Sequence, residues 1–182
     1  MILASRHGQT WWLTGLPAAG KTTLANLLCQ RLRSSGEPAC LLDGDLIRQG
    51  LCRDLGYSPA DRAENVRRVA ELARLLNESS IHAVVALISP TIEGRANARS
   101  IVGDNRFIEV HVATPLAVCQ ARDPKKLYAK AMHTPGMGMT GLDAPYEAPP
   151  APAVVIDTVI VAPGVAVEMM LAVAASSCGT SP

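Results

Sequence analysis

The stretch Gly15-Leu16-Pro17-Ala18-Ala19-Gly20-Lys21-Thr22 fits G-x-x-x-x-G-K-[ST], the pattern of a phosphate-binding loop. The apolar residues 10–14 before it predict a strand, and residues 22–33 after it carry leucines at helical spacing. Glycines let such a loop wrap its backbone N–H groups around phosphates at the start of a helix. The competing interpretation is a chance glycine-rich turn, and the flanking elements argue against it.

The loop predicts how a nucleoside triphosphate would be held. Lys21 should reach the β- and γ-phosphates, and the Thr22 hydroxyl should be a ligand of Mg²⁺. A GTPase would also show an N-K-x-D-like element, which the sequence lacks, and a motor ATPase needs a chain longer than 182 residues. We therefore expect a small-molecule kinase. The expected ATP contacts are Gly15, Leu16, Pro17, Ala18, Ala19, Gly20, Lys21, Thr22 and Thr23.

Strand-like and helical segments alternate along the rest of the chain, which predicts an α/β fold with a parallel sheet and right-handed crossovers. Ser58-Pro59 before an acid at position 61 is typical of a helix start. We expect a single domain over residues 1–182. Further strands are expected at 39–42, 83–88, 107–112 and 153–156, and further helices at 58–77, 95–102, 115–122 and 165–175.

Composition excludes several classes of protein. Apolar residues make up 48% and charged residues 18% of the chain, which argues against disorder, and the net charge of +1 argues against a nucleic-acid partner. No apolar run reaches the ~18 residues that a membrane span needs, and Arg6, His7 and Gln9 interrupt any signal peptide. The 5 cysteines form no C-x-x-C pair, so we expect reduced, buried thiols in a cytoplasmic protein rather than a catalytic cysteine.

The lysines are unevenly placed. The chain has four: Lys21 in the phosphate loop, and Lys125, Lys126 and Lys130 in a segment rich in glycine and proline. We interpret residues 123–152 as a lid with some helix near 127–132. A lid carrying lysines would add positive charge over the bound phosphates.

Charged residues downstream suggest where a second substrate binds. Asp43 and Asp45 follow the second expected strand, at the edge of the sheet where ligands bind, and could hold metal-bound waters or accept a hydroxyl proton. A solvated turn is the alternative. Arg62 and Asn65 share a helix face, and with Arg48 they suit phosphate or sulfate oxygens. A solvated arginine-rich helix fits Arg67, Arg68 and Arg74 better.

With these residues the sequence resembles the adenylylsulfate kinase (APS kinase) family over about residues 11–158. The matching segments follow in order and with family-like spacing. They are residues 12–16 (WLTGL), 20–23 (GKTT), 42–45 (LDGD), 47–48 (IR), 50–51 (GL), 54–58 (DLGYS), 61–62 (DR), 64–68 (ENVRR), 88–90 (ISP), 122–123 (RD), 140–141 (TG) and 145–149 (PYEAP), with Cys119 and Lys125.

The resemblance implies a three-layer P-loop kinase fold with a five-stranded parallel sheet and a lid. It implies transfer of the ATP γ-phosphoryl to the 3′-hydroxyl of adenosine 5′-phosphosulfate (APS), giving PAPS and ADP in sulfate assimilation. It also suggests a homodimer and a functional link to an ATP sulfurylase.

The resemblance also implies residue roles. Lys21, Asp43, Asp45 and Ser89 would be catalytic, Thr22 and Asp43 would hold Mg²⁺, and Arg122 would lie beside the ATP base. Ser89 matches a serine assigned as a phosphoserine intermediate, although direct in-line transfer needs none, and a loop-capping role is the alternative. The substrate-binding residues would be Arg48, Tyr57, Arg62, Asn65, Lys125, Lys130 and Met139, of which Lys125 and Lys130 match lid lysines near the phosphates.

Several positions depart from the family pattern. Pro17-Ala18 stands where Ser-Gly is usual, and Lys126 replaces a lid glycine. Leu46, Ile92 and Met139 replace an Asn, an Arg and an aromatic that the resemblance places on the acceptor side. Two alternatives therefore stay open: a kinase for another small hydroxyl acceptor, and a nucleotide-binding regulatory domain that has lost turnover.

Overall fold

The computed structural model describes residues 8–133, 139–142 and 144–177. Its centre is a parallel sheet of five strands in the order β2-β3-β1-β4-β5. The strands are β1 (Thr10–Thr14), β2 (Ala39–Asp43), β3 (His82–Ala86), β4 (Phe107–Val112) and β5 (Val154–Ile156). The predicted α/β fold with a five-stranded parallel sheet is confirmed.

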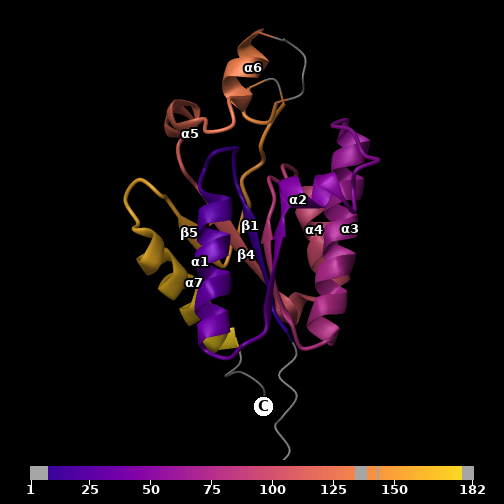
Figure 1. Ribbon diagram of the computed structural model, residues 1–182, viewed down its shortest axis with the longest axis vertical. Coiled ribbons are helices and arrows are strands. Elements are labelled where there is room, and N and C mark those ends of the chain that lie inside the picture. The colour runs from indigo at the N-terminus through magenta and orange to yellow at the C-terminus, as the bar shows by residue number, and fades with distance from the viewer. Residues whose placement is uncertain (1–7, 134–138, 143, 178–182) are drawn as a thin grey trace, which may run out of the picture.

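Helices cover both faces of the sheet (Figure 1). Helices α1 (Lys21–Ser34) and α7 (Pro163–Ser177) pack on one face, and α3 (Pro59–Glu78) and α4 (Ile92–Val102) pack on the other. Short helices α2 (Gly44–Gln49), α5 (Leu116–Arg122) and α6 (Leu127–His133) lie toward the carboxyl ends of the strands, and a 3₁₀ turn spans Asp104–Arg106. Among the described residues, no helix is long and apolar enough to cross a bilayer.

Strand β1 holds the two cores together. All five of its residues are buried, and because side chains alternate along a strand, Trp11 enters the core under α1 while Trp12 enters the core under α3. Burial of two indoles contributes several kcal/mol at about 25 cal/mol per Å². The phosphate loop therefore follows the most firmly buried strand of the sheet.

Local sequence explains most helix starts. The Ser58 hydroxyl accepts a hydrogen bond from the Asp61 N–H at 3.1 Å, as the predicted cap requires. Helix α4 starts at Ile92, three residues before its predicted start, because Thr91 caps it by accepting from the Gly94 N–H. Helix α2 was not predicted: Asp43 ends β2 and at the same time caps this helix through the Asp45 N–H.

Two non-glycine residues adopt left-handed backbone conformations where the resembled family has glycine. Ala18 has φ of 59° and Lys126 has φ of 53°. A side chain in this region costs roughly 1–2 kcal/mol relative to the right-handed region. The chain thus keeps the family's backbone shape at these positions without the residue that favours it.

Candidate active site

A cavity of about 790 Å³ opens at the carboxyl ends of the strands. The phosphate loop, α2, α3, the end of β3 and the segment around α6 all contribute to its wall. Most of the predicted site residues line this cavity: Pro17, Ala18, Gly20, Lys21, Thr22, Thr23, Asp43, Asp45, Arg48, Tyr57, Arg62, Asn65, Ser89, Arg122, Lys125, Lys130 and Met139. Gly15, Leu16 and Ala19 lie behind the wall and shape the loop instead.

The phosphate loop has little room for other residues. A Cβ at Gly15 would lie 2.5 Å from the Val112 carbonyl oxygen, and Gly20 has φ of 108° just before α1. Glycine is therefore required at both positions. Helix α1 begins at Lys21, so its unpaired N-terminal N–H groups and positive dipole end face the cavity.

Lys21 is buried and bonded to the loop itself. Its Nζ donates to the Gly15 carbonyl at 2.9 Å and to the Leu16 carbonyl at 2.7 Å. Burial lowers the pKa of Lys21 to about 8, and the positive charge of Lys125 acts in the same direction. An anion beside Lys21 would reverse that shift.

Thr22 and Asp43 form a pair of hard oxygen donors. The Thr22 hydroxyl donates to Asp43 Oδ2 at 2.7 Å, and Asp43 Oδ1 accepts from the Asp45 N–H at 3.0 Å. Among the described residues no cluster of three or more His, Cys, Asp or Glu side chains could hold a metal alone. One hydroxyl and one carboxylate fit Mg²⁺, which takes few protein ligands and completes its shell with phosphates and water.

The lid segment reaches across the cavity to α2. Lys125 Nζ forms an ion pair with the Asp45 carboxylate, and both side chains are about half exposed. Lys130 is part of the cavity wall, whereas Lys126 is not among the residues that line it. The predicted gathering of lysines therefore holds for Lys125 and Lys130. Residues 134–138 and 143 of the predicted lid lie outside the described residues.

The acceptor side of the cavity is built around an aromatic ring. The Arg48 guanidinium lies 4.5 Å from the centre of the Tyr57 ring, and the Arg62 guanidinium lies 5.6 Å from it. Arg62 also donates to Thr140 Oγ1 at 3.3 Å. Two cations on one exposed ring make a surface for a planar anion.

Asn65 has an unpartnered polar atom in this wall. The residue is 4% exposed, and its Oδ1 is buried without a hydrogen-bond partner in the described structure. A buried polar atom left unpaired costs about 1–3 kcal/mol. A ligand N–H group or an ordered water placed there would remove that cost.

Ser89 is held by a hydrogen bond from the central strand of the sheet. It is 4% exposed and has φ of 40°, and its Oγ accepts a hydrogen bond from Trp12 Nε1 at 3.0 Å. Among the described residues, no carboxylate or imidazole is hydrogen-bonded to Ser89 Oγ. The geometry favours the loop-positioning role over a nucleophile, which needs an adjacent base.

Sequence reasoning missed the partner of Arg122. Arg122 Nη1 donates to Thr158 Oγ1 at 2.6 Å, and this hydroxyl also contacts the Ala19 carbonyl at 3.1 Å and the Thr114 hydroxyl at 2.8 Å. Thr158 thus ties Arg122 to the phosphate loop. Its only sequence signal was its position two residues after the last strand.

The structure changes where two of the residues that depart from the family pattern lie relative to the cavity. Of the three residues expected on the acceptor side, Met139 lines the cavity but Leu46 and Ile92 do not. Leu46 is 62% exposed on α2, and Ile92 lies at the start of α4, facing a different hollow. Leu46 and Ile92 therefore do not contribute to the cavity wall in this chain.

The cysteines behave as small apolar residues. Cys29, Cys52 and Cys119 are buried, Cys40 is half-buried, and burial raises the pKa of the three buried thiols. Cys178 lies outside the described residues. A raised pKa disfavours the reactive thiolate, which supports a structural role.

Together, the loop after β1, the buried lysine and the hydroxyl–carboxylate pair at the edge of a five-stranded parallel sheet define a P-loop kinase. The chain matches the adenylylsulphate kinase family over residues 7–157. It therefore belongs to the adenylylsulphate kinase family.

Two named relatives and one solved structure illustrate this membership. The chain is 49% identical over 154 residues to an adenylyl-sulfate kinase of Shewanella denitrificans, covering 85% of this chain and 75% of the relative. It is 49% identical over 147 residues to that of Erwinia tasmaniensis, covering 81% and 73%. An APS kinase of Mycobacterium tuberculosis, solved with AMPPNP and APS, superposes with a TM-score of 0.88 at 40% identity, covering 92% and 97%.

Proposed function

We propose that this protein transfers the γ-phosphoryl group of ATP to the 3′-hydroxyl of APS, forming PAPS and ADP. The observation that carries the proposal is that one cavity holds both a phosphate loop and the cluster of Arg48, Tyr57, Arg62 and Asn65. A nucleotide bound by the loop and an anionic purine nucleotide bound by the cluster would meet inside this cavity. The M. tuberculosis APS kinase with AMPPNP and APS supports the same pairing.

On the ATP side, the chain supplies charge and fixed N–H groups. Lys21 leaves its loop carbonyls for the β- and γ-phosphates, and the start of α1 faces them. Thr22 and Asp43 would hold Mg²⁺, which neutralises charge on these phosphates when bound. Arg122, fixed by Thr158, would lie against the adenine.

On the acceptor side, Arg48 and Arg62 would bind the phosphosulfate oxygens, Tyr57 and Met139 would pack on the adenine, and the Asn65 carboxamide would bind an N–H group. Asp45 would accept the proton of the 3′-hydroxyl as its oxygen bonds to the γ-phosphorus and the bond to ADP breaks. Asp43 suits this role less, because Thr22 and the Asp45 N–H already occupy its oxygens.

The lid lysines would close the site. Lys125 pairs with Asp45 Oδ2 in the structure, and movement of this lysine toward the phosphates would leave the whole carboxylate available to accept a proton. Lys125 and Lys130 would then approach the phosphates and help to exclude water. Ser89 would position the loop at the end of β3 without forming a phosphoserine.

The test is product formation from ATP and APS by the purified protein, with adenosine 5′-phosphate and gluconate as control acceptors. We expect ADP and PAPS in equal amounts with APS only. Phosphorylation of a control acceptor alone would favour the second kinase hypothesis. Binding of both nucleotides without product would favour a regulatory domain.

Further properties implied by the family stay predictions. They are a homodimer, a functional link with an ATP sulfurylase and action in the cytoplasm. The single domain over residues 1–182 is a prediction of the same kind. The two cores on opposite faces of one sheet support it.

A further inference from the structure

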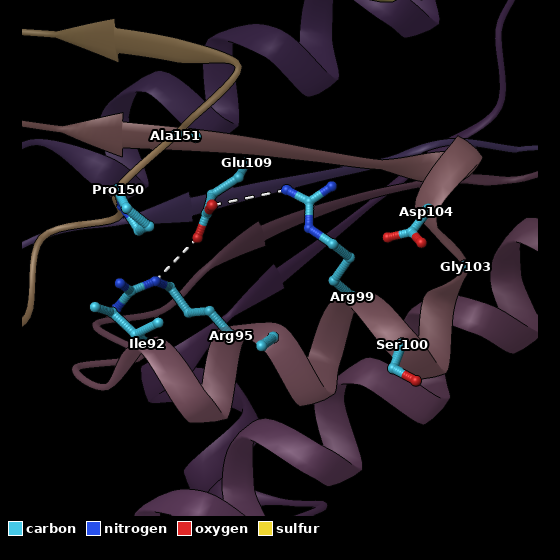
Figure 2. Close-up of a pocket in the computed structure, with 10 residues that line it drawn as sticks. Ile92, Arg95, Arg99, Ser100, Gly103, Asp104, Glu109, Pro150 and Ala151 are labelled. Atoms are coloured by element: carbon cyan, nitrogen blue, oxygen red, sulfur yellow. Dashed lines mark hydrogen bonds and ion pairs between the residues drawn. The ribbon is translucent and has the colours of Figure 1, made fainter.

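A buried ion pair lies outside the cavity of the proposed active site. Arg95 on α4 is 2% exposed and its Nε donates to Glu109 Oε1 on β4 at 2.9 Å. Figure 2 shows both side chains beside a second hollow of about 710 Å³, which α4 and residues Pro150 and Ala151 border. A buried charge pair is costly to desolvate and persists only where further hydrogen bonds satisfy it.

The other nitrogens of Arg95 bind two backbone carbonyls that are far apart in the sequence. Nη1 donates to the Ser89 carbonyl at 2.7 Å, and Nη2 donates to the Glu147 carbonyl at 2.6 Å. The guanidinium also lies 5.8 Å from the centre of the Tyr146 ring. One planar group therefore joins the loop after β3 to the last part of the predicted lid segment.

Both joined segments lead into the acceptor side of the cavity. Residues 88–90 form part of its wall. The return segment, which we define as residues 144–150, is bonded at its start to Met139, because the Ala144 N–H donates to the Met139 carbonyl at 3.1 Å. A shift of either segment would therefore move residues that face the acceptor.

Additional hydrogen bonds link the loop after β3 to the return segment. The Glu147 N–H donates to the Pro90 carbonyl at 2.8 Å, and the Ile92 N–H donates to the Glu147 carboxylate at 2.6 Å. The Tyr146 hydroxyl bonds to the Thr14 hydroxyl at 3.0 Å, and its ring stacks on His111. Arg95 lies at the centre of these contacts.

We propose that Arg95 is a positioning residue for the acceptor: its buried guanidinium sets the spacing between the Ser89 loop and the return segment. The proposal rests on the proposed function, because the acceptor is taken to be APS. A guanidinium can bind three acceptors in one plane, whereas an ammonium cannot span them. Arg95 itself has no place in the cavity wall.

Arg99 provides a matched control. It lies one turn further along α4 and reaches the same carboxylate, with Nη2 at 3.7 Å from Glu109 Oε2 (Figure 2). Within the part of the chain that the structure describes, its remaining contacts are the Phe107 carbonyl and ring, and it forms no bond to the Ser89 loop or the return segment. Replacing Arg99 therefore changes the cationic group beside Glu109 without touching the Ser89 loop or the return segment.

The experiment is steady-state kinetics of Arg95→Lys and Arg99→Lys beside the unchanged protein. For Arg95→Lys we expect the KM for APS to rise about 10- to 100-fold, the effect of a displacement near 1 Å, with an unchanged KM for ATP. For Arg99→Lys we expect both KM values to stay unchanged. Equal KM values for APS in the two variants, or a parallel rise for ATP and APS, would overturn the proposal.

Two additions keep the outcomes distinct. If Arg95→Lys does not fold, Glu109→Gln takes its place, since it keeps the side-chain size but removes the charge that anchors Arg95; an unchanged KM for APS in this variant overturns the positioning role. The unchanged protein tests the proposed function separately. If it forms no PAPS, that function fails, and calorimetric titration of APS into the variants then decides the positioning role.

Discussion

The two halves of the active-site cavity differ in how far their polar groups are already partnered. In the phosphate half, Lys21, Thr22 and Asp43 are all hydrogen-bonded within the chain. In the acceptor half, Asn65 Oδ1 is buried without a partner and the Tyr57 ring is 63% exposed between two arginines. The phosphate half is shaped largely by the backbone of the loop, whereas the acceptor half is shaped by side chains, so we expect the acceptor half to determine the specificity.

The largest effect should come from the phosphate half. Lys21→Ala removes a charge aimed at the transferred group, so we expect kcat to fall by about 10³-fold. The matched control is Lys126→Ala, since Lys126 lies in the lid segment but outside the cavity wall. An equal fall of kcat in both variants would contradict the special role of Lys21 in the phosphate half.

Asn65 tests the acceptor half. Asn65→Leu should raise the KM for APS at least about tenfold, because a ligand N–H would lose its acceptor, and leave the KM for ATP unchanged. Its unfolding temperature without ligand should not fall, since the unpaired Oδ1 is removed.

The control for Asn65 is Asn77 on the same helix. Its carboxamide is fully used, with bonds to Thr10 and to the carbonyls of Gln9 and Ile81. Asn77→Leu should therefore lose about 1–3 kcal/mol of stability and keep the KM for APS. The reverse assignment of the two effects would contradict the account.

The pH dependence of ATP binding should follow Lys21. Its pKa of about 8 without ligand must rise when phosphates bind, because they favour the charged form. Above about pH 8 binding therefore takes up a proton, and the affinity for ATP should fall by about tenfold per pH unit. Calorimetry in buffers of different ionisation enthalpy measures this uptake, which should vanish in Lys21→Ala.

Ser89 lies between the two halves and should have a smaller effect. Ser89→Ala loses one hydrogen bond from Trp12, so we expect kcat to fall by no more than about threefold. Trp12→Phe removes the same bond from the other side and should change kcat similarly. Loss of all activity in Ser89→Ala, with normal folding, would instead support a phosphoserine intermediate.

The smallest effect concerns the backbone of the phosphate loop. Ala18→Gly relieves a left-handed alanine but adds freedom to the unfolded chain, so we expect a net gain of about 0.5 kcal/mol. Ala19→Gly is the control: Ala19 is buried without a positive φ, so its loss should destabilise by about 1 kcal/mol. Denaturant unfolding measures both, and equal signs would contradict the strain at Ala18.

The phosphate half was easier to predict from sequence than the acceptor half, for a physical reason. A loop that binds phosphate through its backbone needs fixed residues at fixed spacing. The pattern of residues 15–22 therefore identifies the loop from the sequence alone. Arg95 donates to the carbonyls of Ser89 and Glu147, and Thr158 donates to the carbonyl of Ala19. In both cases the fold brings the partner from a distant segment of the chain. No local pattern carries such contacts.

Secondary structure shows the same contrast. The strand at residues 107–112 was predicted with its observed bounds, because four of its six residues are β-branched or aromatic apolar residues. Helix α2 was missed, since Asp43-Gly44-Asp45 reads equally well as a turn, and the capping bond of Asp43 decides for the helix. Strand β3 ends at Ala86, two residues before its predicted end, because Ala86 pairs with Asp43, where β2 ends and α2 begins.

The central claim is that both halves of one cavity serve phosphoryl transfer from ATP to APS. Its most direct test is to follow the purified protein with ATP, Mg²⁺ and APS by quantifying ADP and PAPS together, with Lys21→Ala in parallel. We expect one PAPS for each ADP from the unchanged protein and almost none from Lys21→Ala. Folded protein that releases ADP without PAPS, or forms neither, would contradict it.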